Sequence, residues 1–197
     1  MWKSTEFRSD FAQRWEIKPF ATPNGLSTSA GRTAAGVSDN EEITAWHEAG
    51  HAFAAVYLGA TVDSVSIDPD RDDGPNRFGD TVVRWEAAAV SGQELAEKSI
   101  LVALAGPVAE MIHRGDPFHP ATVAEWSLDW QLAWRAANFV EPAKERLQLL
   151  ERLTLQLHQT LSQQHHWAAI GAVVDHLLAH EVLEGETVHE IVAAWSD

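Results

Sequence analysis

One stretch of the chain, residues 44–52 with the sequence TAWHEAGHA, places two histidines four residues apart with a glutamate directly after the first. On an α-helix, residues four apart share one face with their Cβ atoms about 5–6 Å apart, so His47 and His51 can direct imidazole nitrogens at one cation. Glu48 lies one step further round the helix, within reach of a water on that cation. The HExxH pattern therefore predicts a metal site in which Glu48 is the general base.

A five-residue pattern also arises by chance, so the flanking residues matter. Ser38 and Glu41 form a capping box before it, and Gly59 follows it as a helix end. Apolar or small residues continue one face at helical spacing beside the histidines: Ile43, Trp46, Gly50, Phe53, Ala54 and Tyr57. The sequence thus predicts that the pattern lies in the middle of an amphipathic helix.

Composition limits the chemistry available to this site. The chain has 197 residues, of which 45% are hydrophobic, enough for one core and one domain over residues 38–197. It has no cysteine, so thiolate metal sites and disulfides are excluded. Any zinc must be held by imidazole and carboxylate groups, which is typical of hydrolytic sites.

Charge and hydropathy exclude two kinds of partner. The formal net charge is −15 without a cluster of lysines and arginines, which argues against binding to nucleic acid. No apolar run approaches the length of a membrane helix, and the first residues do not form a secretory signal. We therefore expect no membrane contact and a cytoplasmic location.

Residues 1–37 differ from the rest of the chain because prolines and glycines interrupt every periodic pattern there. Phe7, Phe11 and Trp15, spaced by four, are the exception and are compatible with a short amphipathic helix. We expect an N-terminal tail or linker, in which these aromatic residues either dock on the body or a partner, or belong to a frayed end.

A β-hairpin is predicted after the motif helix. Residues 62–68 and 81–85 alternate apolar and polar side chains, and a turn-rich acidic loop over residues 69–79 separates them. A strand there either holds an extended substrate at the sheet edge or simply covers the core. The loop lacks the ligand spacing of an EF-hand, so we interpret it as solvated rather than calcium-binding.

A second helix is predicted from a capping box at Ser91 and Glu94, through the apolar residues 100–105, to Gly115. Gly106 and Pro107 are expected to kink or restart it. Glu110 follows this apolar run. Its carboxylate either accepts the second N–H of a metal-bound imidazole or extends into solvent.

A catalytic zinc site needs a third protein ligand besides two histidines. The acidic and histidine candidates later in the chain are His113, Asp116, His119, Glu125 and Asp129. A carboxylate at a helix start is favoured, because packing holds it in place, and residues 127–133 provide one. Trp126, Trp130 and Trp134 form a stripe on the same segment, which we interpret as core or an inter-subunit contact rather than a substrate site.

The remaining chain is predicted to be helical. Pro142 is suited to a helix start, leucines at steps of three or four follow it, and further helices are expected over residues 167–180 and 187–195. His176 and His180 repeat the four-residue spacing without a carboxylate context. We interpret them as partly solvated helix residues and not as a second metal site.

Several motifs occur in the order found in the peptidase domain of FtsH-type ATP-dependent zinc metalloproteases. Residues 47–52, HEAGHA, match the signature of that family, and residues 104–110, LAGPVAE, resemble its L-A-G-x-x-A-E segment. Asp129 with Ala133 resembles the family's D-x-x-x-A, and residues 180–186 are similar to its E-T-L-x-G-x-E stretch. The likeness spans residues 41–193.

The resemblance implies a mainly α, helical zincin-like metallopeptidase domain with a small β-hairpin or sheet beside the HEAGH helix. It selects Asp129 as the third zinc ligand after His47 and His51, with Glu48 as the catalytic base and Glu110 behind the ligands. The expected function is a zinc-dependent endopeptidase. Two alternatives are a regulatory protein-binding module that retains the zinc site and a domain that only folds around its metal.

The chain also departs from that family. An ATPase module and membrane helices precede the peptidase domain in FtsH-type proteins, whereas about forty residues do so here and no P-loop is present. We therefore expect cleavage of peptides or unfolded segments, with any ATPase or unfolding activity supplied by a separate partner. Pro107 and the long acidic loop also differ from the family, which bears on substrate docking and on homo-oligomer assembly.

Overall fold

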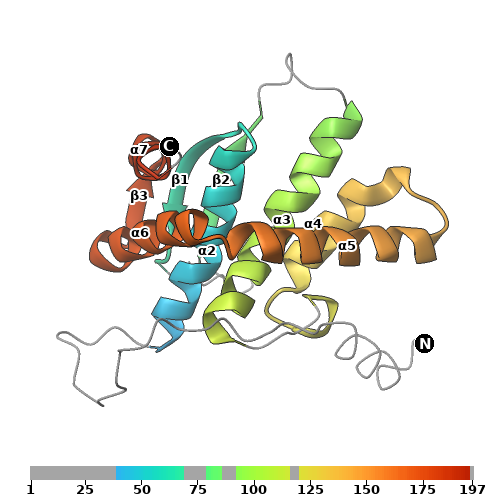
Figure 1. Ribbon diagram of the computed structural model, residues 1–197, viewed down its shortest axis with the longest axis horizontal. Helices are drawn as coiled ribbons and strands as arrows, with labels where there is room; N and C mark the ends of the chain where they lie inside the picture. The colour runs from blue at the N-terminus through green and yellow to red at the C-terminus, as the bar shows by residue number, and fades with distance from the viewer. Residues whose placement is uncertain (1–38, 69–78, 86–91, 116–119, 196–197) are drawn as a thin grey trace, which may run out of the picture.

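A computed structural model of the protein describes residues 39–68, 79–85, 92–115 and 120–195, and this part is mainly helical with a small three-stranded sheet (Figure 1). The elements in chain order are α2 Asp39–Tyr57, β1 Thr61–Ser66, β2 Asp80–Arg84, α3 Gly92–Arg114, η1 Pro120–Thr122, α4 Ser127–Ala136, η2 Ala137–Phe139, α5 Ala143–Leu161, α6 Gln164–His180, β3 Val182–Glu184 and α7 Gly185–Ala193. The tail over residues 1–37, residues 69–78 of the acidic loop and the capping residues Ser38 and Ser91 lie outside the described ranges. Among the described helices, none is long and apolar enough to cross a lipid bilayer.

Helices α2 and α3 form the centre of the molecule, and small residues let them approach closely. Ala45, Ala49 and Ala52 are fully buried on α2. At Gly50, an added Cβ would lie 2.6 Å from the carbonyl oxygen of Ala105 on α3. The contact therefore requires glycine, and it brings the HExxH segment directly against α3.

Helix α3 runs without a break from Gly92 to Arg114. Of the two expectations for Gly106 and Pro107, a kink or a restart, the restart is therefore wrong. Proline lacks the N–H that would bond to Ala103, four residues earlier, and this loss usually interrupts a helix. Here the helix continues because its middle is buried on all sides, from Ala103 to Met111. Packing against neighbouring elements compensates for the missing hydrogen bond.

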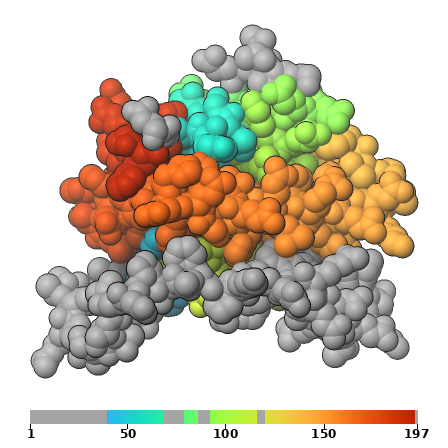
Figure 2. Space-filling view, in the orientation of Figure 1, coloured from blue at the N-terminus to red at the C-terminus, as the bar shows by residue number. Residues whose placement is uncertain are grey.

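Helices α5 and α6 cover one face of this central pair. In Figure 1 they cross in front of it, and Figure 2 shows them as a continuous orange band over this side of the molecule. α6 packs on α2, and α5 packs on α3. Fully buried apolar side chains lie on their inward faces at the predicted helical spacing: Leu150, Leu161, Ile170, Val173 and Leu177.

The sheet has the strand order β2-β1-β3 and is antiparallel throughout. β1 and β2 form the predicted hairpin, with the pairing interrupted by an irregularity between Val62 and Ser64. The third strand was not expected, because β3 has only three residues with a single buried side chain, Leu183. β1 packs on α2, so the sheet lies beside the HExxH helix.

The C-terminal helices lie close to their predicted positions. α5 begins at Ala143, directly after Pro142, as expected. α6 begins three residues before the predicted start at residue 167, and α7 begins at Gly185 rather than at residue 187. At Gly185 an added Cβ would overlap the carbonyl of Val62, so this glycine lets α7 pack directly on β1.

Candidate metal centre

Three ligand-type side chains from two helices converge at one point. His47 and His51 project from α2, and Asp129 lies in the first turn of α4. One ligand atom from each lies within 4.8 Å of the other two. The Nε2 atoms of the two histidines are 3.1 Å apart, and the Asp129 oxygens lie 3.2 Å from Nε2 of His47 and 3.5 Å from Nε2 of His51. Residues far apart in sequence thus form one compact group.

The opposite ring nitrogens of both histidines are already paired. Nδ1 of His47 donates to the Glu110 carboxylate at 3.1 Å, and Nδ1 of His51 donates to the backbone carbonyl of Val102 at 2.7 Å. A carboxylate or carbonyl oxygen accepts, so each Nδ1 carries the proton in the neutral ring. The Nε2 lone pairs therefore face each other and Asp129, which is the arrangement that a cation stabilises.

Among the five candidates for the third ligand, Asp129 is the one that the described structure brings to the histidines. His113 lies elsewhere, because its ring stacks on Trp46 with 4.8 Å between centroids and its Nε2 lies 3.7 Å from Glu42. Glu125 is exposed in the turn before α4, and Asp116 and His119 lie outside the described residues.

The electrostatics of the group favour a positive charge. Burial opposes protonation of His47, but its hydrogen bonds with Asp129 and Glu110 outweigh burial and raise its pKa to about 10. Burial also opposes ionisation of Asp129, yet the hydrogen bond with His47 and the charges of both imidazoles lower the pKa of its carboxyl. In the protein without metal, a proton on His47 supplies this positive charge. The donor set of two imidazoles and one carboxylate fits a divalent transition metal such as zinc.

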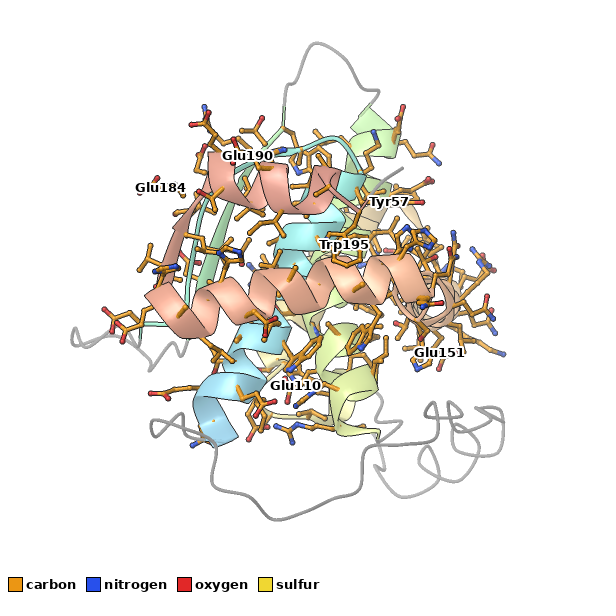
Figure 3. All side chains as sticks on the ribbon, turned by 60° about the vertical axis from the view of Figure 1, so that its left-hand side comes forward. Tyr57, Glu110, Glu151, Glu184, Glu190 and Trp195 are labelled. Atoms are coloured by element: carbon orange, nitrogen blue, oxygen red, sulfur yellow. The ribbon has the colours of Figure 1, made fainter. Side chains whose placement is uncertain are left out.

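Glu110 supports the group from behind and is only 4% exposed, so its carboxylate does not extend into solvent. It projects from α3 toward α2 (Figure 3). Its Oε1 forms an ion pair with Arg114 at 2.6 Å, and its Oε2 accepts hydrogen bonds from His47 and, at 2.6 Å, from the indole N–H of Trp126. Three side chains hold the carboxylate that orients the His47 ring.

Glu48 is also buried, at 7% exposure, and the β2 side of the sheet holds it in place. The hydroxyl of Thr81 on β2 donates to Oε2 of Glu48 at 2.6 Å. The backbone of Gly79 packs closely on the Glu48 side chain. An added Cβ at Gly79 would lie 2.6 Å from Cγ of Glu48. The proposed base is therefore fixed by the residues that lead into the edge strand.

A second glycine makes room for the metal-facing histidine. At Gly106 on α3, an added Cβ would lie 2.3 Å from Nε2 of His51. Gly106 belongs to the L-A-G-x-x-A-E segment found in the sequence, and its role becomes visible only when α2 is placed on α3. Sequence reasoning also missed Trp126, Thr81, Gly79 and Val102 as supports of the group. Their contacts with Glu110, Glu48 and His51 join residues from different elements, and no local pattern in the sequence records such contacts.

No protein-family model matches the chain, and no curated protein matches it either. The class that the fold and the site define is a mainly helical domain with a small three-stranded sheet, in which a His/His/Asp group could hold a metal ion.

Proposed function

We propose that this protein is a zinc-dependent endopeptidase with a helical, zincin-like fold, which hydrolyses peptides or unfolded segments. The observation that carries the proposal is the convergence of both Nε2 atoms and the Asp129 carboxylate, with Glu48 adjacent to His47 on the same helix. Three protein ligands leave one position of a tetrahedral zinc open, and catalytic zinc sites share this feature.

Different residues of the chain have different roles in the proposed hydrolysis. His47, His51 and Asp129 would hold the metal, with Glu110 and the Val102 carbonyl fixing the orientation of the two rings. A bound zinc would supply Lewis acidity, lowering the pKa of water toward about 7 and polarising the scissile carbonyl. Glu48 accepts the proton of the attacking water and returns it to the leaving amine.

The sheet offers a place for an extended peptide. β2 forms an edge of the described sheet and carries Thr81, which contacts Glu48. A peptide that pairs with this edge would lie next to the proposed base. Because pairing needs an extended backbone, the arrangement favours peptides, flexible segments or chains unfolded by a separate partner.

The test combines metal analysis with cleavage of a peptide library by the wild type and Glu48→Gln. General acid–base catalysis contributes about 10²- to 10⁴-fold, so Glu48→Gln should keep its zinc and lose that much activity. Glu190→Gln is the matched control, because Glu190 is an exposed carboxylate on α7, and it should change neither property.

Three results would contradict the proposal. Retained hydrolysis by Glu48→Gln would show that Glu48 is not the base. A wild type that binds zinc and cleaves nothing would favour the regulatory binding module, and melting on chelation without any cleavage would favour a metal with a folding role.

A further inference from the structure

Trp126 contacts Glu110 and lies just before Asp129 in the chain. It directly precedes α4, it is 1% exposed, and its indole N–H donates to Oε2 of Glu110 at 2.6 Å. Asp129 follows three residues later, in the first turn of the same helix. The position of Trp126 therefore helps to set where the Asp129 carboxylate lies.

The same oxygen atom of Glu110 also accepts the hydrogen bond of His47 Nδ1, at 3.1 Å. A single carboxylate oxygen on α3 is thus shared by a donor from α2 and a donor at the start of α4. These two helices carry the His47 and Asp129 ligands, whose atoms must meet within a few ångströms.

We propose that Trp126 is a positioning residue for the metal centre: its indole N–H ties the start of α4 to Glu110 and thereby holds Asp129 in register with His47. The inference rests on the proposed metal site. Residues that orient metal ligands typically contribute 10- to 100-fold to metal affinity.

Two observations separate this role from ordinary packing. No side chain caps the N-terminus of α4, so the first turn of this helix is not fixed by the usual hydrogen bond from an N-cap residue. In addition, the fold tolerates a buried indole N–H without a partner, as it does at Trp46. Burial of Trp126 alone therefore does not explain why its N–H donates to the same carboxylate oxygen that accepts from Nδ1 of His47.

The experiment measures zinc affinity by competition with a chromogenic chelator. Trp126→Phe keeps an aromatic ring and removes the N–H, and we expect its zinc Kd to rise about ten-fold or more. Trp134→Phe is the matched control. Trp134 lies on α4, and its ring packs under the Arg146 guanidinium. The zinc Kd of this variant should stay within about two-fold of wild type. The melting temperature of the zinc-free proteins reports any general loss of packing separately.

A double-mutant cycle tests whether Trp126 acts through Glu110. In a Glu110→Leu background the acceptor is gone, so adding Trp126→Phe should weaken zinc binding by less than about two-fold. A full ten-fold loss in that background would show a packing role and would overturn the inference.

A measurement on the unaltered protein covers the case in which Trp126→Phe does not fold. In nuclear magnetic resonance spectra, zinc alone should shift the indole proton of Trp126 and leave that of Trp134 in place. An unmoved Trp126 signal would overturn the inference. These measurements use zinc without any peptide, so they separate this inference from the proposed function. If Trp126→Phe bound zinc as tightly as the wild type, this inference alone would be wrong. If the wild type did not bind zinc, the proposed function would be wrong as well.

Discussion

The hydroxyl of Thr81 on strand β2 donates a hydrogen bond of 2.6 Å to the carboxylate of Glu48 on helix α2. The proposed general base is thereby attached to the edge strand rather than only to its own helix. Because Oε2 accepts this hydrogen bond, the Thr81 hydroxyl restrains the orientation of the Glu48 carboxylate. A substrate that pairs with β2 would consequently contact the strand that orients the base.

Removing this hydroxyl should slow the reaction without removing the metal. A hydrogen bond to a charged group contributes about 1.5–3 kcal/mol, so we expect Thr81→Val to lower kcat by about 10- to 100-fold. KM and zinc content should stay near wild type, because Thr81 is not among the metal-facing residues. Steady-state kinetics and metal analysis check both expectations.

Thr81→Ser is the control for this prediction, because it keeps the hydroxyl and loses only a methyl group. It should recover most of kcat. If Thr81→Ser were as slow as Thr81→Val, the strand's packing and not its hydroxyl would control Glu48.

The sequence predicted those features that depend on the spacing of residues within one helix or strand. Helical periodicity alone places His47, Glu48 and His51, and the hairpin followed from alternating residues. Asp129 was one of five candidates until the resemblance selected it, because its approach to His47 depends on how α4 packs on α3. The tryptophan stripe indicated burial of Trp126, but no local pattern predicted its hydrogen bond to Glu110 or the hydrogen bond from Thr81 to Glu48, since both contacts join different elements.

Zinc binding should release a proton, and its affinity should depend on pH. The pKa of His47 is raised from 6.5 to about 10, so this ring is protonated at neutral pH in the metal-free protein. A metal must displace that proton, so apparent zinc affinity should rise about ten-fold per pH unit while the pH is below the pKa of His47 and level off near pH 10. Titration calorimetry at pH 7.5 in two buffers of different ionisation enthalpy should detect at least one proton released per zinc. Binding without proton release would mean that the histidine pair is not the site of the metal.

Glycine-to-alanine substitutions should distinguish effects on zinc affinity from effects on the stability of the fold. At Gly106 the three atoms nearest to an added Cβ all belong to the His51 ring, with Nε2 at 2.3 Å, and a side chain can swing away. Gly106→Ala should therefore fold, with helix propensity contributing up to about 1 kcal/mol in its favour, while zinc affinity falls because His51 leaves the group.

Two further glycines provide the comparison. At Gly50 the added Cβ would meet the backbone oxygen of Ala105, so Gly50→Ala should separate α2 from α3 and lower the melting temperature together with zinc binding. At Gly171 the nearest atom belongs to Trp46 at an ordinary 3.7 Å, so Gly171→Ala should leave zinc affinity unchanged. Thermal unfolding and chelator competition on the three variants give the two readouts. If Gly106→Ala bound zinc as tightly as wild type, the Nε2 atom of His51 would not be a ligand, and the metal would have to be held elsewhere.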